Sequence, residues 1–102
     1  MPRIDVPVDQ IPQAVPLRFE QAGTAIVVVR AGDRIAAFLD RCPHADWPLS
    51  EGEVIDGVLQ CQGHGFEFDI ASGRCINSPV HELKPLSVRR SDDRVQIEWD
   101  DS

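Results

Sequence analysis

Two short segments of the chain each hold one cysteine and one histidine, at a spacing that suits metal binding. The first is Cys42-Pro43-His44 and the second is Cys61-Gln62-Gly63-His64. Thiolate sulfur and imidazole nitrogen are typical ligands of zinc and of iron–sulfur centres. Cys42, His44, Cys61 and His64 are therefore the candidate metal ligands.

The stretch between these two segments, residues 45–60, favours a fold-back that brings them together. It contains Asp56-Gly57, a dipeptide typical of a two-residue hairpin turn, between the strand-like segments Glu53–Ile55 and Val58–Gln60. Because a hairpin returns the chain beside its starting point, we expect all four candidate ligands to converge on one place.

The order of the ligands bears on the kind of centre. Classical zinc fingers place two cysteines together and two histidines together, whereas here each segment supplies one of each. The interleaved order suits a two-iron cluster in which one iron takes both cysteines and the other takes both histidines. The same four ligands also permit a structural zinc module that binds a partner, which stays an alternative.

The rest of the chain indicates one small domain made of strands. Its 102 residues are 42% hydrophobic and 26% charged, which is a globular composition. Eight prolines and seven glycines interrupt the chain, and no segment keeps a helical period. Besides the hairpin at Asp56-Gly57, strands are expected at residues 15–21, 24–30, 34–39, 65–70, 86–90 and 95–99. Many short strands at close spacing predict an all-β sandwich or barrel, with irregular loops at residues 41–52 and 75–83.

Composition also excludes two classes of partner. The net charge of −7 would repel a phosphate backbone, so no nucleic acid is expected. The longest apolar run, residues 25–29, is far shorter than the roughly 20 residues of a membrane-spanning helix. Since the N-terminal residues show no apolar signal segment either, a soluble cytoplasmic protein is expected.

The Cys-x-His and Cys-x-x-His segments, with residues 45–60 between them, resemble those of the Rieske [2Fe–2S] proteins. Residues 42–52 (CPHADWPLSEG) are similar to the first cluster loop of the small ferredoxins that serve bacterial ring-hydroxylating dioxygenases. Residues 64–73 (HGFEFDIASG) are similar to their second loop, and Ser78-Pro79 to the proline loop that covers the cluster. The resemblance extends from about residue 26 to residue 99.

The resemblance implies a fold and a cofactor. The fold is a Rieske-like antiparallel β-sandwich with a small inserted cluster-binding subdomain, all within one domain of residues 1–102. Base strands are expected at about 1–39 and 81–102, and the cluster-binding subdomain at about 40–80. One [2Fe–2S] cluster per chain would have Cys42 and Cys61 on the inner iron. His44 and His64 would hold the outer iron, near solvent.

Further residues are expected around this cluster. Trp47 would shield the cluster by packing, and Pro79 belongs to the loop that would cover it. Gly63 and Gly65 would let backbone N–H groups approach the cluster. Two residues of ligand type are assigned no such role. Cys75 is expected to be a small, semi-buried side chain, and His81 a surface side chain.

The function that the resemblance implies is one-electron transfer, from a flavin-containing reductase to a terminal oxygenase of aromatic hydrocarbon catabolism. The chain would be a carrier and not an enzyme, because it has neither a second, pocket-forming domain nor a mononuclear iron triad. The small subunit of a nitrite reductase is an alternative. An oxygenase domain cut from a longer chain is another alternative. The acidic segment of residues 98–102 is expected to mark a natural end, which argues against it.

Two departures from high-potential Rieske proteins bear on the reduction potential. Those relatives carry an extra cysteine in each loop, at positions that look like Trp47 and Gly63 here, and these cysteines form a disulfide. They also donate hydrogen bonds to the cluster sulfurs from a serine, whose position looks like Phe66 here, and from a tyrosine, a residue type this chain lacks. Fewer donors disfavour the reduced cluster, so we expect a potential of roughly −150 mV.

Acidic residues surround the first loop. Asp46, Glu51, Glu53 and Asp56 would form a docking surface for a basic partner, although a solvated acidic rim explains such residues more often.

Overall fold

The computed structural model describes residues 2–42, 47–61, 65–77 and 82–99. The strands are β1 (Arg3–Pro7), β2 (Leu17–Gln21), β3 (Thr24–Ala31), β4 (Arg34–Leu39), β5 (Glu53–Ile55), β6 (Val58–Gln60), β7 (Glu67–Asp69), β8 (Ser87–Ser91) and β9 (Arg94–Glu98). Two short 3₁₀ helices, η1 (Val8–Gln10) and η2 (Leu49–Glu51), accompany them. Within these ranges no α-helix occurs, and no helix is long and apolar enough to cross a membrane. The predicted all-β class is confirmed.

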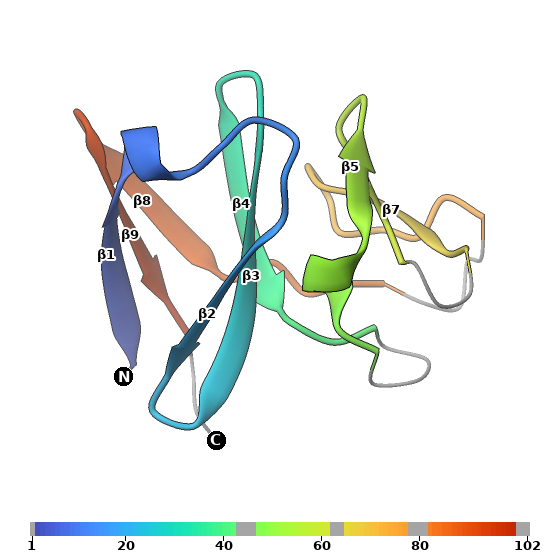
Figure 1. Ribbon diagram of the computed structural model, residues 1–102, viewed down its shortest axis with the longest axis horizontal. Helices are drawn as coiled ribbons and strands as arrows, with labels where there is room; N and C mark the ends of the chain where they lie inside the picture. The colour runs from blue at the N-terminus through green and yellow to red at the C-terminus, as the bar shows by residue number, and fades with distance from the viewer. Residues whose placement is uncertain (1, 43–46, 62–64, 78–81, 100–102) are drawn as a thin grey trace.

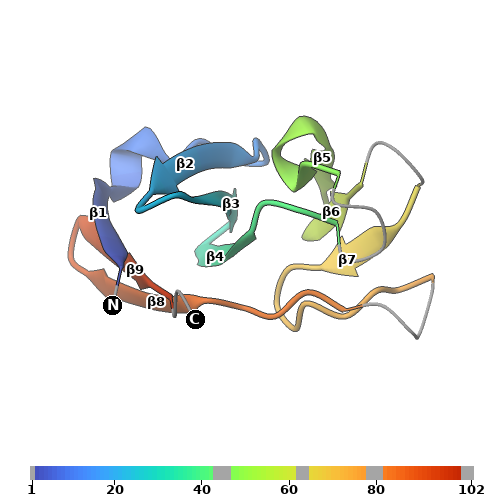
Figure 2. The same ribbon diagram turned by 90° about the horizontal axis from the view of Figure 1, so that it is seen from below.

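The nine strands found in the described ranges form three antiparallel sheets of three strands, in the orders β1-β9-β8, β2-β3-β4 and β5-β6-β7. In Figure 1 the first sheet lies at one end of the molecule, the second in the middle, and the third at the other end. Figure 2 shows the first two sheets as facing layers, which is the expected sandwich. The third sheet forms entirely between β4 and β8 in the sequence. The predicted limits of the cluster-binding part, residues 40–80, stay a prediction.

Strand β3 separates two hydrophobic cores. Ile26 and Val28 point into a core between the first two sheets, where they meet Val95 and Ile97 of β9. Val27 and Val29 alternate with them and point into a second core shared with the β5-β6-β7 sheet. The side chains of these four β3 residues are fully buried, as expected for a β-branched run covered on both faces. The central sheet therefore supports both the sandwich and the region of the predicted metal site.

Local turn chemistry accounts for the hairpins. Asp56 and Gly57 both have positive φ angles (52° and 77°), as a type I′ turn between β5 and β6 requires. The strands predicted at residues 24–30 and 34–39 are present as β3 and β4, and they pair as an antiparallel hairpin. The β8–β9 turn differs slightly from the prediction, since Ser91 belongs to β8 and Asp92-Asp93 alone make the turn.

Two strands depart further from the prediction. β1 was not expected, because Pro2 directly before it and Pro7 at its end disfavour a strand. Its Ile4 and Val6 point inward, and it pairs with β9 from Arg3↔Glu98 to Pro7↔Arg94. β7 covers only Glu67–Asp69 of the expected residues 65–70. It begins late because Gly65, at a φ angle of +72°, and Phe66 belong to a loop instead.

Candidate functional site

Cys42 lies at the start of a closed loop shortly after β4. Its side chain is fully buried, and its backbone N–H donates a 2.7 Å hydrogen bond to the Trp47 carbonyl. This bond joins the two ends of residues 42–47, the segment that contains His44. The first predicted ligand is therefore fixed at its backbone and faces the protein interior.

Cys61 is placed in the same way at the end of β6. It is fully buried, and its N–H donates a 2.7 Å bond to the carbonyl of Phe66. Its own carbonyl accepts a 3.0 Å bond from the Gly65 N–H. Gly65 takes a left-handed φ of +72°, which a side chain would strain, so glycine is needed for this second closure.

The two loops therefore close alike, from residue 42 to 47 and from 61 to 66, although their Cys–His spacings differ. Cys42 and Cys61 belong to one hydrophobic core together with Leu59 and Phe68, and neither forms a disulfide. The structure thus brings the two predicted cysteine ligands into one buried region. The two predicted histidine ligands, His44 and His64, lie outside the described residues.

A tight backbone contact joins Gly52, a few residues after the first loop, to Gln60, directly before the second. Gly52, directly before β5, lies against the carbonyl of Gln60, the residue before Cys61, so closely that a Cβ atom at Gly52 would overlap the carbonyl oxygen. Pairing of Glu53 with Gln60 continues this contact into the β5–β6 ladder. The hairpin predicted between the two segments therefore does bring the loops together.

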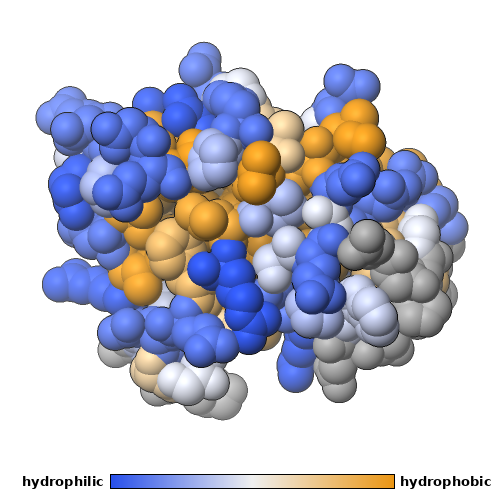
Figure 3. Space-filling model, in the orientation of Figure 1, coloured by the Kyte–Doolittle hydropathy of each residue, from blue (hydrophilic) through white to orange (hydrophobic). Residues whose placement is uncertain are grey.

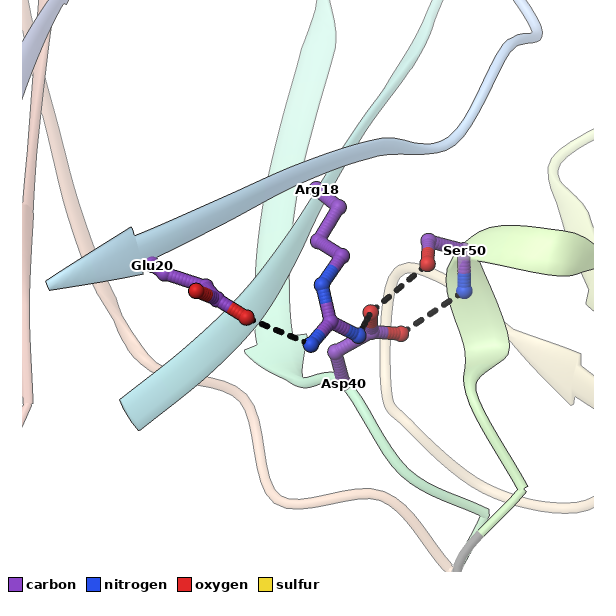
Figure 4. Close-up of polar contacts among 4 residues, drawn as sticks. All are labelled: Arg18, Glu20, Asp40 and Ser50. Carbon is purple, nitrogen blue, oxygen red and sulfur yellow. Dashed lines mark hydrogen bonds and ion pairs between the residues drawn. The ribbon is translucent and has the colours of Figure 1, made fainter. Parts of the chain in front are cut away.

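The buried carboxylate of Asp40, just before the first loop, joins η2, just after that loop, to β2 of the sandwich (Figure 4). The Asp40 side chain is fully buried and accepts three hydrogen bonds: from Arg18 Nη1 of β2 at 2.8 Å, and from the Ser50 N–H and Oγ of η2 at 2.7 and 2.6 Å. Arg18 also pairs with Glu20. The hydrogen bonds that the Arg18 guanidinium donates to Glu20, which has the larger effect, and to Asp40 raise its pKa. Asp40 therefore connects β2, the end of β4 and η2 in one charged network.

The other predicted residues have mixed outcomes. Trp47, expected to shield the cluster, is 40% exposed, and Cys75 is buried in the same core as Cys42 and Cys61. Glu51, Glu53 and Asp56 are exposed, as an acidic surface requires. Gly63, Pro79, His81 and Asp46 lie outside the described residues.

Three polar residues near the loops were missed by the sequence interpretation: Asp40, Ser50 and Asn77. The contacts that join Asp40 to Arg18 and Ser50, and Asn77 to Gly65 and Glu67, all span at least ten positions in the chain. No local pattern of residue types marks such contacts, so the sequence offered no signal for them.

The donor set fits a metal cluster held by thiolates. The parts of the chain that are described contain no group of three or more potential metal ligands. Two of the four predicted ligands, His44 and His64, are not among the described residues. What they do contain is a pair of buried, unbridged thiols at the starts of two matched loops. An apolar environment disfavours a bare thiolate, and a bound metal ion compensates for its charge. The arrangement suits an iron–sulfur or a zinc centre.

Comparison with known families and sequences points to one of these centres. The Rieske [2Fe-2S] domain profile matches residues 3–89. The biphenyl 2,3-dioxygenase ferredoxin component of Rhodococcus jostii (strain RHA1) is 35% identical over 83 residues, which are 80% of this chain and 78% of that protein. Protein TIC 55 of Pisum sativum is 40% identical over 70 residues, which are 68% of this chain but only 12% of that much longer protein.

Solved structures agree with the sequence comparisons. A chain of the complex of reduced oxygenase and oxidized ferredoxin in carbazole 1,9a-dioxygenase is 26% identical and superposes with a TM-score of 0.84, covering 93% of this chain and 91% of that chain. A nitrite reductase small subunit described as putative superposes with a TM-score of 0.79, over 97% of this chain and 100% of that one. Because that pair is only 19% identical, it shows a shared fold alone.

Proposed function

Because the chain belongs to the Rieske [2Fe-2S] domain family, we propose that it is a one-electron carrier that delivers electrons to a terminal oxygenase. A [2Fe–2S] cluster is the cofactor of this family and supplies a single redox step. Two curated relatives that this chain spans over most of their length are ferredoxin components and not catalytic subunits.

The observation that carries the proposal is the matched closure of the two loops. Cys42 and Cys61 each start a loop closed by the same N–H to carbonyl bond, and both are buried in one core. We propose that their thiolates hold one iron, while His44 and His64 hold the other. Burial of Cys42 and Cys61 would limit the access of water to the iron that they hold, and the paired β5–β6 hairpin between them would limit their rearrangement when the charge changes.

The partners follow from the relatives. The Rhodococcus relative is a ferredoxin component of a dioxygenase, and the carbazole structure contains a ferredoxin in complex with its oxygenase. We propose an oxygenase of this kind as the electron acceptor and a flavin-containing reductase as the donor, both in the cytoplasm. The fold likeness to a nitrite reductase small subunit brings no comparable sequence identity, so we favour the oxygenase partner.

The exposed part of the third sheet has the chemistry of a docking surface. The β5–β6 hairpin presents Glu53 and Asp56 beside Ile55, which is 56% exposed. In Figure 3 an apolar spot lies over this hairpin among hydrophilic neighbours. A mixed acidic and apolar surface suits a partner with basic residues around an apolar centre.

A redox titration followed by a transfer assay tests the proposal. The purified protein should lose visible absorbance on reduction in a single one-electron transition. A purified terminal oxygenase with a Rieske centre should then restore that absorbance under anaerobic conditions. A protein without a reversible one-electron transition would refute the carrier function. A reversible carrier that no such oxygenase reoxidises would refute the partner.

A further inference from the structure

The side-chain amide of Asn77 connects three groups around the second loop. Its Nδ2 donates to the Gly65 carbonyl at 3.0 Å, and its Oδ1 accepts from the Glu67 N–H at 3.1 Å. The Cys75 thiol donates to the same oxygen at 3.2 Å. Because a carbonyl only accepts and an N–H only donates, these partners allow one orientation of the amide.

This amide continues a strand pairing that the backbone leaves incomplete. Cys75 pairs with Phe68, and the Ile76 N–H donates to the Glu67 carbonyl at 2.7 Å, so residues 75–76 run along the edge of β7. At residue 77 the side chain takes over from the backbone and reaches past β7 to Gly65. Asn77 therefore links the segment after Cys75 to the loop that starts at Cys61.

Gly65 is the residue that follows His64, and both of its backbone polar groups are bonded. Its N–H donates to the Cys61 carbonyl and its carbonyl accepts from Asn77. The backbone directly after the predicted ligand His64 is thus held at Gly65 by two hydrogen bonds. One is to Cys61, at the start of the same loop, and the other is from Asn77, twelve positions after Gly65. Loss of the Asn77 bond would leave the left-handed Gly65 peptide with one restraint fewer.

We infer that Asn77 is a positioning residue for the metal site, because it holds the backbone of the second ligand loop at Gly65, the residue next to the predicted ligand His64. This inference rests on the proposed [2Fe–2S] site. Residues that orient a metal ligand through a hydrogen bond tune both the retention of the metal and its electronic structure. Asn77 bonds the residue next to the predicted ligand, so its loss should change both the retention of the cluster and its electronic structure by measurable amounts.

The decisive variant is Asn77→Asp, which keeps the size of the side chain. Its carboxylate still accepts from the Glu67 backbone N–H and the Cys75 thiol. It donates nothing to the Gly65 carbonyl, however, and places a second oxygen against that carbonyl oxygen. Asn77→Ala removes all three bonds. Cys75→Ser keeps a donor to Asn77, and Ile76→Ala alters a neighbouring side chain that is 59% exposed, so both serve as matched controls.

Two readouts on the holoprotein test the inference: the rate of cluster loss to an iron chelator and the g values of the reduced protein in electron paramagnetic resonance (EPR). We expect Asn77→Asp and Asn77→Ala to lose the cluster about tenfold faster than the wild type, with shifted or broadened g values. Both controls should match the wild type.

Each other outcome has a defined meaning. If Asn77→Asp keeps the wild-type loss rate and g values, the inference is wrong. If neither Asn77 variant assembles a cluster while Ile76→Ala does, the inference stands. If Ile76→Ala fails as well, the segment matters as a whole and the assignment to Asn77 is wrong. The wild-type spectrum tests the proposed site separately, since a wild type without a [2Fe–2S] signal refutes that site and not the hydrogen-bond comparison.

Discussion

Arg18 and Asp40 form an ion pair between the sandwich and the first ligand loop. Arg18 Nη1 lies 2.8 Å from Asp40 Oδ2, with the Arg18 side chain 43% exposed and the Asp40 side chain fully buried. A buried carboxylate is costly unless its oxygens are satisfied, and Asp40 meets this condition with Arg18 and both donors of Ser50. The pair therefore helps to hold η2 and the first loop against β2.

Replacement of Asp40 by Asn should lower the free energy of unfolding by about 2 kcal/mol, because hydrogen bonds to a charged group are lost. The amide offers one oxygen where the structure uses two, so one donor of Ser50 or Arg18 would face an NH₂ group. Urea unfolding followed by circular dichroism measures the change. Glu20→Gln, at a side chain that is 67% exposed, is the control and should change stability by less than about 0.5 kcal/mol. Equal stability of Asp40→Asn and the wild type would contradict this role.

The contact between Gly52 and Gln60 predicts that Gly52→Ala is strongly destabilising, by about 3 kcal/mol, because its Cβ would overlap the backbone oxygen of Gln60. Gly23→Ala is the matched control, since Gly23 also lies beside a strand but has open space around it. Its φ of +78° should cost only about 1 kcal/mol. Thermal unfolding compares the two variants, and a Gly52→Ala protein no less stable than Gly23→Ala would show that the loops do not need this close approach.

The reduction potential should lie near the lower end of the Rieske range, at roughly −150 mV, because the chain has no tyrosine and Phe66 is expected at the position of the serine donor of high-potential relatives. A value well above zero in a potentiometric titration would rule this out.

A donor introduced at residue 66 tests the same cause directly. Phe66→Ser should have a higher potential than Phe66→Ala by about 60 mV, if a hydrogen bond of about 1.4 kcal/mol forms to the reduced cluster. The alanine variant loses the same packing without gaining a hydroxyl group, so the difference isolates the donor. Equal potentials in the two variants would show that residue 66 does not face a cluster sulfur.

Electron transfer to the acceptor should depend on salt if the acidic surface of Glu51, Glu53 and Asp56 takes part in docking. Charge-neutralising variants (Glu51→Gln, Glu53→Gln and Asp56→Asn together) should slow transfer about tenfold at low ionic strength. The difference should vanish near 1 M salt, where the screening length falls to about 3 Å.

Asp92→Asn provides the control for this surface, because Asp92 is an exposed acid in the β8–β9 turn at the opposite end of the molecule (Figure 1). Stopped-flow rates across ionic strengths make the comparison. A triple variant with the rate and salt dependence of Asp92→Asn would mean that the acids near the first loop form only a solvated rim.

Features that local residue chemistry determines could be predicted from the sequence. The β5–β6 hairpin has its predicted bounds because Asp56-Gly57 suits a type I′ turn. The double burial of β3 follows from its run of β-branched residues. The two cysteines were singled out because their residue type and spacing suit metal ligands, and both proved to be buried in one core.

Features that depend on distant contacts could not be predicted in this way. β1 is stabilised by β9, at the other end of the chain, and the prolines at its two ends disfavour a strand although Ile4 and Val6 alternate with polar residues. Asp40 and Asn77 are ordinary polar residues in the sequence. Their roles come from Arg18 and Gly65, which only the folded chain places beside them.

The central claim is that Cys42, Cys61, His44 and His64 hold one [2Fe–2S] cluster. EPR of the anaerobically purified protein, combined with iron and sulfide analysis, tests it most directly. We predict two irons and two sulfides per chain and a rhombic signal that appears only on reduction. This signal should be lost in Cys61→Ser and retained in Cys75→Ser. A colourless protein with stoichiometric zinc, or a signal that persists in Cys61→Ser, would contradict the claim.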